Sequence, residues 1–195
     1  MRVSRPTRLA ALFLALSGAA HAQTTAFVGG RVIDGTGRVI ERGTVVVSGR
    51  TIASVGPASL PIPPGATQIH LGGKTILPGL VNAHGHVAAT SGLDSDPARF
   101  YTRPNLLRQL QTYAKYGVTT VFSLGDDDVA GFQIRDDNAS ATDRARLFVA
   151  GPVINGQTAA EGRAMAATVA AMKPDLLKIR VDDNLDRKST RLNSS

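Results

Sequence analysis

The stretch LPGLVNAHGHV, residues 77–87, ends an apolar run with two histidines that are two positions apart. Side chains at positions i and i+2 of an extended strand point to the same face of that strand. A strand over this stretch would therefore present the imidazoles of His84 and His86 side by side, as a metal site requires. The whole chain has only four histidines, so this pair is the first indication of a function.

The residues after Pro78 alternate between strand and helix patterns. Apolar side chains at helical spacing predict helices in RPNLLRQLQTYAKYG and AAEGRAMAATVAAMK. Strands are predicted at GLVNAH, VTTVFSL, ARLFVAG and DLLKIRV. Such alternation is typical of βαβ units in a parallel sheet or barrel, and four units make half of an eight-stranded barrel. In that barrel the active site lies at the carboxyl ends of the strands, where His84, His86 and Lys178 are expected.

The residues before this region have a different sequence pattern, without the alternation of strands and helices. From Thr24 to about Thr75 the chain reads as short strands rich in Val, Ile and Thr, with glycine at the breaks. The proline-rich stretch GPASLPIPPGA between them must be a loop. This part is predicted to be a small all-β unit that is too short to bury a good core alone.

The sequences at the two ends of the chain differ in composition from the rest. Residues 1–22 combine three arginines, a short apolar run and the small-residue pattern Ala20-His21-Ala22, which predicts a secretory signal peptide cleaved after Ala22. The apolar run is far shorter than the roughly 20 residues of a membrane-spanning helix, so no stable membrane insertion is expected after cleavage. Export would place the protein in the periplasm or outside the cell. Residues 187–195, RKSTRLNSS, lack apolar periodicity and read as a non-native tail, with a natural disordered tail as the alternative.

Charge and cysteine content exclude several classes of function. The formal charge is +7, but three cations lie in residues 1–22 and three in 187–195, which leaves +1 for residues 23–186. The high isoelectric point is thus no evidence for a nucleic-acid partner. The absence of cysteine rules out disulfides and thiolate metal ligands, so a metal must be held by histidine, carboxylate or a modified side chain.

Several motifs, in order along residues 26–183, resemble the amidohydrolase superfamily of metal-dependent hydrolases. RVIDGTG and GTVVVSGRTIASVG are similar to the start of that family's β-sandwich. GGKTILPGLVNAHGHV resembles the strand that enters the barrel with a His-x-His motif, and KPDLLKIRVDD resembles the fourth strand. The likeness is greatest to the imidazolonepropionase-like and Xaa-Pro-dipeptidase-like branch. The expected fold class is therefore α/β, an N-terminal part of a composite β-sandwich followed by the first half of a (β/α)8 TIM-type barrel.

The resemblance also implies the ligands. His84 and His86 would bind one divalent metal, and Lys178, as a carbamate, would bridge to a second. Zinc is the expected ion, with one or two bound. The implied activity is hydrolysis of carbon–nitrogen bonds, in amides or peptides, by a metal-activated water. The substrate would be a small molecule or a short peptide, and a homo-oligomer is compatible with this reading.

The chain also departs from the family pattern. Asn82 replaces the usual aspartate, Phe122-Ser123 replaces Arg-Asp, and the Gly-Gly-His expected after the third strand is absent. The family takes further ligands from the fifth and sixth strands and a catalytic aspartate from the eighth, which would lie beyond residue 195. The chain is thus expected to be an incomplete fragment with a signal peptide (1–22), a sandwich portion (23–77), barrel strands 1–4 (78–186) and a tail (187–195). The alternative is a non-catalytic half-barrel that is inactive alone or needs a partner chain.

Other residues have simpler interpretations. Asp126, Asp127 and Asp128 follow the second predicted strand and are expected to form a solvated loop, because adjacent carboxylates do not all face one point. His70 is expected at the surface or on an edge strand. The glycines at 72, 73 and 79 have no following Lys-Ser/Thr pair, so a phosphate-binding loop is not predicted.

Overall fold

The computed structural model describes residues 23–180, so the predicted signal peptide and the predicted tail lie outside the described residues. The described residues divide into two compact units, the first ending at Pro78 and the second beginning at Gly79, and each unit has its own principal sheet. No helix within residues 23–180 is both long and apolar enough to cross a bilayer.

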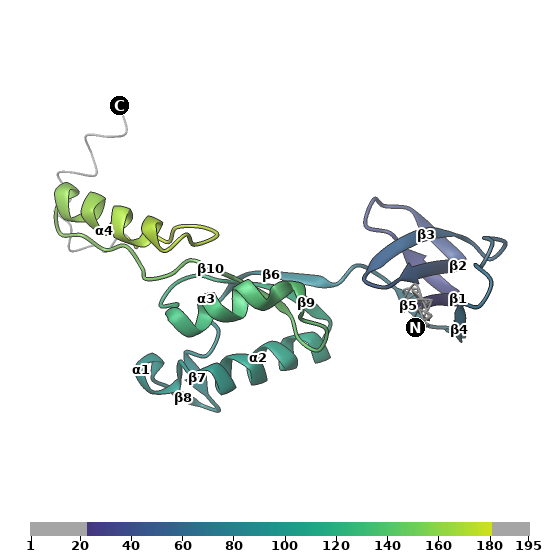
Figure 1. Ribbon diagram of the computed structural model, residues 1–195, viewed down its shortest axis with the longest axis horizontal. Coiled ribbons are helices and arrows are strands. Elements are labelled where there is room, and N and C mark those ends of the chain that lie inside the picture. The colour runs from purple at the N-terminus through teal and green to yellow at the C-terminus, as the bar shows by residue number, and fades with distance from the viewer. Residues whose placement is uncertain (1–22, 181–195) are drawn as a thin grey trace, which may run out of the picture. The chain divides into compact units, whose positions relative to one another are not determined.

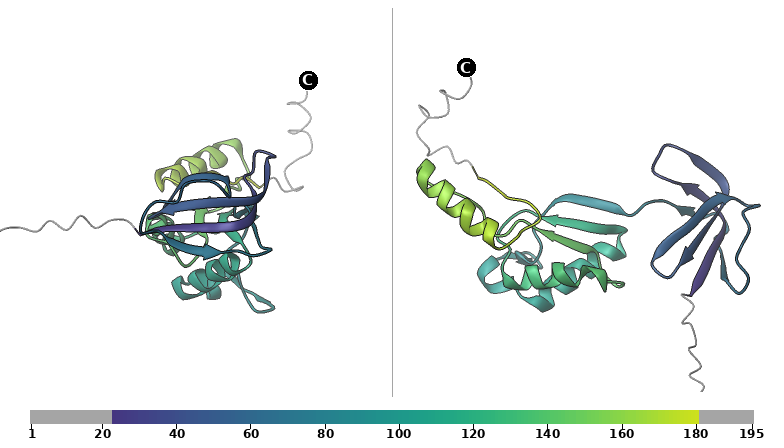
Figure 2. Two further views of the ribbon diagram at one scale, coloured as in Figure 1. Left: turned by 90° about the vertical axis from the view of Figure 1, so that its right-hand side faces the viewer. Right: turned by 45° about the horizontal axis from the view of Figure 1, so that its top comes forward.

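The first unit contains a five-stranded sheet (Figure 1). The strand order is β3-β2-β1-β4, and β5 also pairs with β1. β1, β2 and β3 form an antiparallel meander, whereas β4 and β5 run parallel to β1. The left-hand view of Figure 2 looks onto these strands. Their bounds are β1 Thr24–Ile33, β2 Val39–Ser48, β3 Thr51–Pro57, β4 Thr67–His70 and β5 Thr75–Ile76.

The local sequence explains this sheet. Valine, isoleucine and threonine suit a pleated, half-buried surface, and Ala26, Val32, Val45 and Val46 are its buried core. Gly49 makes the tight turn from β2 to β3 at a φ of 58°, a left-handed conformation that glycine adopts without steric cost. His70 ends the exposed strand β4, which pairs only with β1 among the described residues, so the edge-strand prediction is confirmed. Within residues 23–78 the strands make one sheet, and the two-sheet sandwich stays a prediction.

The second unit is built on a parallel sheet of three strands in the order β10-β9-β6. The predicted strands at GLVNAH, VTTVFSL and ARLFVAG and both predicted helices are confirmed, with boundaries shifted by a few residues. A short hairpin, β7–β8, and the short helix α1 follow β6. The elements are β6 Leu80–Gly85, β7 Thr90–Ser91, β8 Asp94–Ser95, α1 Pro97–Phe100, α2 Arg103–Lys115, β9 Val118–Ser123, α3 Val129–Asp136, the 3₁₀ helix η1 Asp137–Ala139, β10 Arg146–Val149 and α4 Ala159–Ala171.

Helices α2 and α3 cover the same face of this sheet (Figures 1 and 2). Leu106 and Leu110 of α2 and Ile134 of α3 are fully buried. They pack with Val121 of β9 and with β10, whose Leu147 and Val149 are also buried. We call this surface the helix-covered face. It contains the main hydrophobic core of the second unit.

The helix α3 was not predicted from the sequence. It is only eight residues long, and a glycine, Gly131, lies in its first turn. Glycine lowers helix propensity by about 1 kcal/mol relative to alanine. The structure explains its presence, because a Cβ at Gly131 would collide with the hydroxyl of Tyr101. A tertiary contact therefore requires the residue that weakens the local helix signal.

The predicted fourth strand, DLLKIRV, is wrong in its extent. Over residues 175–180 the chain makes a single parallel bridge, between Ile179 and Ile154. Two backbone hydrogen bonds support the bridge, from the Ile154 N–H to the Lys178 carbonyl (2.8 Å) and from the Arg180 N–H to the Ile154 carbonyl (3.0 Å). At Asp175, where a ladder would begin, the side-chain carboxylate accepts the Val149 N–H (2.9 Å). The Val149 N–H of β10 is therefore bound by the side chain of Asp175, and not by a backbone carbonyl of a neighbouring strand.

Candidate functional site

The candidate site lies at the carboxyl ends of β6, β9 and β10. His84 is the last residue but one of β6, and His86 is the first residue after the strand. Both side chains are exposed. Their ring centres are 5.6 Å apart and the ring planes are tilted by 48°. Asn82 supports this strand end, since its Oδ1 accepts the His84 N–H (3.1 Å) and its Nδ2 donates to the Tyr113 hydroxyl (3.2 Å). The asparagine that replaces the family's aspartate is therefore bound to the backbone of the histidine pair.

The end of β9 is joined to the segment that carries the histidines. The register pairs Gly85 with Ser123, and the Leu124 N–H donates to the Gly85 carbonyl (2.8 Å). The buried Ser123 hydroxyl accepts the Val87 N–H (3.4 Å), one residue beyond the second histidine. The residues that follow β9 therefore start next to His86.

Lys178 reaches the same edge from the segment after α4. Its backbone is held by the bonds to Ile154, and its Cγ lies 3.7 Å from the position that a Cβ on Gly125 would occupy. Gly125 has a φ of 112°, and a Cβ there would also collide with Val153. Glycine at this position lets the lysine segment come close to the end of β9. Thus the structure brings all three predicted ligands, His84, His86 and Lys178, to one edge of the sheet.

The surroundings favour a neutral imidazole at His86. Partial desolvation, and then the neighbouring His84, lower the pKa of His86 below its usual value. The carboxylate of Asp126 acts in the opposite direction, while the charges of Lys178 and Arg180 lower the pKa further. A neutral ring keeps a nitrogen lone pair available, which metal coordination requires. Asp126 itself is exposed and has a φ of 62°, an uncommon conformation for a residue other than glycine.

The separation of the two histidine rings is close to the value expected for a shared divalent ion. Zinc is bound about 2.0–2.1 Å from an imidazole nitrogen in tetrahedral geometry, which would place two ring centres about 5 Å apart. The observed separation is 5.6 Å. Within residues 23–180 no group of three or more His, Cys, Asp or Glu side chains is close enough to hold a metal. A carbamate on Lys178 would add oxygen donors to the two imidazoles.

Asp127 contradicts the prediction that residues 126–128 form a solvated loop. Its side chain is only 1% exposed. Its Oδ1 accepts the Tyr101 hydroxyl (3.0 Å), and its Oδ2 accepts the N–H groups of Ala150 (2.9 Å) and Gly151 (3.2 Å). Burial raises the pKa of Asp127 to about 6, although these hydrogen bonds act to lower it. The same environment raises the pKa of Tyr101 well above its usual range.

The three consecutive aspartates have three different environments. Asp126 is exposed and lies near His86, Asp127 is buried, and Asp128 caps α3 by accepting the Ala130 N–H (2.8 Å). An aspartate just before a helix is a recognised capping signal, but α3 itself was not predicted, so the role of Asp128 was missed. No local signal marks Asp127, because Tyr101, Ala150 and Gly151, which bind its carboxylate, lie 23–26 residues away in the chain.

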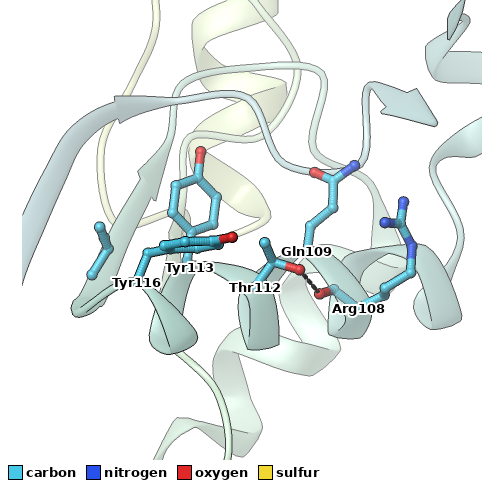
Figure 3. A pocket seen from close by; sticks show the side chains of 6 residues that line it. Arg108, Gln109, Thr112, Tyr113 and Tyr116 are labelled. Atoms are coloured by element: carbon cyan, nitrogen blue, oxygen red, sulfur yellow. Dashed lines mark hydrogen bonds between the residues drawn. The ribbon is translucent and has the colours of Figure 1, made fainter. Parts of the chain in front are cut away.

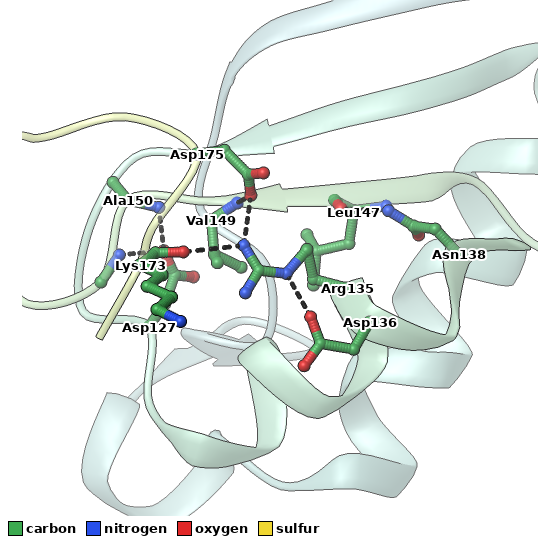
Figure 4. A network of polar contacts seen from close by, with 10 residues as sticks. Asp127, Arg135, Asp136, Asn138, Leu147, Val149, Ala150, Lys173 and Asp175 are labelled. Carbon is green, nitrogen blue, oxygen red and sulfur yellow. Dashed lines mark hydrogen bonds and ion pairs between the residues drawn. The ribbon is translucent and has the colours of Figure 1, made fainter. Parts of the chain in front are cut away.

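A second polar network supports the other side of β10 (Figure 4). The Arg135 guanidinium donates to Asp136 (2.7 Å), to Asp175 (3.2 Å) and to the Lys173 carbonyl (3.1 Å). Asn138 adds a pair of hydrogen bonds to the backbone of Leu147. These contacts fasten α3 and the segment after α4 to β10, so we interpret them as structural.

A cavity of about 420 Å³ lies along α2, away from the histidines (Figure 3). Its lining is mainly apolar, and its hydroxyl-bearing Thr112 is already bonded to the Arg108 carbonyl (2.9 Å). None of the predicted metal ligands lines it. The lining residues are Arg108, Gln109, Thr112, Tyr113, Tyr116 and Val118.

Comparison with known proteins gives a consistent structural result. No protein-family model and no curated protein matches the sequence. Among solved structures, the chain matches a protein from Bifidobacterium longum described as a prolidase (TM-score 0.70, 22% identity, 84% of this chain and 42% of that chain). It also matches a Xaa-Pro dipeptidase with bound methionine in its active site (TM-score 0.64, 22% identity, 80% and 47%). A third match is molinate hydrolase (TM-score 0.57, 31% identity, 69% and 31%).

These matches are all to hydrolases of one superfamily, and the chain spans less than half of their length. They have the mixed α/β architecture seen here. The resemblance inferred from the sequence motifs is therefore confirmed at the level of the fold: over the part that it covers, this chain has the fold of these amidohydrolase-superfamily structures.

Proposed function

We propose that the chain is part of a metal-dependent hydrolase that cleaves carbon–nitrogen bonds with a metal-activated water. The substrate would be a small amide or a short peptide, as the printed names of the matched prolidase and dipeptidase suggest for those proteins. The observation that carries this proposal is the histidine pair at the edge of the parallel sheet, with ring centres 5.6 Å apart and Lys178 arriving at the same edge.

In this proposal His84 and His86 hold one divalent ion, zinc by preference, and Lys178 as a carbamate holds it or bridges to a second. When bound, such an ion lowers the pKa of its water to near 7 and polarises the substrate carbonyl. The neutral state favoured at His86 suits it as a ligand. The catalytic aspartate expected from the family is not assigned to any described residue.

A second candidate is a non-catalytic half-barrel that is inactive alone or needs a partner chain. Leu80 and Val81 of β6 are more than half exposed, and β6 pairs only with β9 among the described residues. An apolar strand with one free edge is a site for pairing with further strands. The further strands could belong to the same polypeptide, as the fragment hypothesis implies, to a second copy of the chain or to another protein. These three sources define three forms of the half-barrel hypothesis.

We also propose that the protein is exported to the periplasm or beyond, with cleavage after Ala22. The support is the sequence pattern of residues 1–22. The division into sandwich portion (23–77), barrel strands (78–186) and tail (187–195) likewise remains a proposal from the sequence. N-terminal sequencing of the exported protein would test the cleavage site directly.

The metal proposal is tested by titrating the purified chain with zinc and measuring heat and bound metal. We expect binding that is weakened at least about 100-fold by His84→Ala or His86→Ala, because each removes a ligand. His70→Ala is the matched control, since His70 is an exposed histidine of the first unit, and it should bind zinc like the parent. A folded chain that binds no zinc, or binds it equally well in all variants, would refute the metal site.

Hydrolysis of short peptides and N-acyl amino acids by the zinc-loaded chain then separates the two candidates. Turnover that is lost in His84→Ala but kept in His70→Ala supports the hydrolase. Zinc binding without turnover supports the half-barrel, and sedimentation analysis with and without zinc would show whether copies associate.

A further inference from the structure

Asp127 links three segments that are distant in sequence. The aspartate belongs to the loop between β9 and α3, Tyr101 to the segment between α1 and α2, and Ala150 and Gly151 to the segment after β10. Two of these segments directly follow the carboxyl ends of β9 and β10, and Tyr101 lies after α1 in the connection from β6 to α2. The carboxylate is buried, so water does not compete for these hydrogen bonds.

The linked segments are connected to the predicted metal ligands in different ways. Tyr101 lies near the end of the connection from β6 to α2, which begins at the histidine pair and passes through β7, β8 and α1. The first part of this connection is held by Gln109 of α2, whose Oε1 accepts the Ala88 N–H (2.8 Å). Gly151 is three residues before Ile154. The backbone of Ile154 accepts a hydrogen bond from the Arg180 N–H and donates one to the Lys178 carbonyl, so it holds the chain on both sides of Ile179. Asp127 itself is adjacent to Asp126, whose charge acts on His86.

The surroundings are built for this carboxylate. Gly131 lacks the Cβ that would exclude the Tyr101 hydroxyl from Asp127. Gly151 has a φ of 72°, the left-handed region that favours glycine, and this conformation accompanies the N–H to Oδ2 bond. Capping of α3, the ordinary use of an aspartate here, is already performed by Asp128. Burying a carboxylate has a cost, visible in its raised pKa, so its retention needs another reason.

We propose that Asp127 is a positioning residue that fixes the Lys178 segment and the Tyr101 segment relative to His84 and His86, a role that rests on the proposed metal site. It touches neither metal nor substrate. It acts through backbone N–H groups and a hydroxyl, as supporting residues behind metal ligands commonly do. Without it, the three loops would remain attached to the sheet, but the spacing between the lysine and the histidines would no longer be fixed.

The test compares Asp127→Ala with Asp128→Ala in the full chain. Asp128 is the matched control because it is the next carboxylate and has a structural task of its own. Site-resolved amide exchange should show Gly151 exchanging about tenfold or more faster in Asp127→Ala, since its hydrogen bond to a charged group is lost. The Ile154 N–H, which donates to the Lys178 carbonyl, should also exchange faster because the segment is no longer fixed at Gly151. In Asp128→Ala these two amides should exchange as in the parent.

The second measurement is zinc affinity. We expect Asp127→Ala to lower it about 10- to 100-fold, as loss of a supporting residue behind a metal ligand does, and Asp128→Ala to leave it within about twofold. Faster exchange with unchanged zinc affinity would show that Asp127 only stabilises its loops, and the positioning role would be wrong. Equal effects of both variants on exchange would also overturn it.

Two further measurements test the proposal if Asp127→Ala does not fold or if the parent chain binds no zinc. If Asp127→Ala does not fold, Tyr101→Phe removes a single hydrogen bond to the same carboxylate and should give smaller changes in the same direction. If the parent chain binds no zinc, the metal proposal fails by itself. The rate at which an amine reagent labels Lys178 then decides the inference: a changed rate in Asp127→Ala but not in Asp128→Ala supports it, and an unchanged rate refutes it.

Discussion

The helix-covered face and the carboxyl edge of the second unit are organised by different forces. On the helix-covered face, Leu106, Leu110 and Leu147 are fully buried and are held by apolar packing. At the carboxyl edge, the exposed pair His84 and His86 lies beside loops that are joined by hydrogen bonds to the buried Asp127. The face supplies stability, and in the function proposed above the edge would supply the chemistry. We infer from this difference that an edge built from loops needs a buried polar contact to fix its geometry.

The largest expected effect breaks the face and spares the edge. Leu110→Ala removes a side chain that is 0% exposed and leaves a cavity. The free energy of unfolding should fall by about 2–5 kcal/mol. Urea denaturation measures the loss. Amide exchange at Gly151, compared with that at Val121 in the core, should show no selective loosening of the edge, and a selective effect there would contradict the separation of the two regions.

A pH titration isolates the edge. The folded-state pKa of Asp127 is about 6, above the ordinary value of 3.8, so the folded state binds this proton more tightly than the unfolded state. The contribution of this group to stability is therefore greatest below about pH 4 and declines as the pH rises to about 6. The decline amounts to about 3 kcal/mol for a shift of this size.

Asp127→Asn should remove that component, because asparagine does not titrate. The measurement is urea unfolding of the parent and of Asp127→Asn between pH 4 and 7, with the difference between the two curves as the readout. A difference that stays constant over this range, or that changes in the opposite direction, would show that the carboxyl is not held in the environment described.

A smaller effect is expected where the face meets the edge, at Gly131. Alanine there should strengthen α3 by its helix propensity, but its Cβ would collide with the Tyr101 hydroxyl. We expect a net destabilisation of about 1–3 kcal/mol, the usual cost of overpacking. In a Tyr101→Phe background the same substitution should cost less, because the colliding oxygen is gone. Thermal or urea unfolding of the four variants gives the coupling, and additive effects would argue against the contact.

The smallest effect concerns α4, whose only buried residue is Val169. Thr158 and Glu161 form a capping box at its start, with the Glu161 N–H donating to the Thr158 hydroxyl (3.2 Å). Thr158→Ala should cost about 1 kcal/mol. The loss should appear as faster amide exchange in the first turn of α4 and leave zinc affinity unchanged. A change in affinity would mean that α4 takes part in positioning Lys178.

The regular elements of the second unit were readable from local patterns. Leu106 and Leu110 repeat at the helical period, and the strands at 80–85 and 118–123 are short apolar runs ended by turn residues. Periodicity predicts such elements because one face of each must be buried. The histidine pair was readable from its i, i+2 spacing, which brings two side chains to one side of an extended chain, although β6 ends at Gly85, just before His86.

What the local pattern did not contain were the contacts between distant segments. Gly131 weakened the signal for α3, although a contact with Tyr101 makes it necessary. The sequence of Asp126–Asp128 suggested a solvated loop, but Asp127 is buried by residues that follow other strands. The sequence at 175–181 suggested a strand, but Asp175 binds β10 with its side chain and one bridge forms. Burial and pairing depend on what lies opposite in space, so only the tertiary structure decided them.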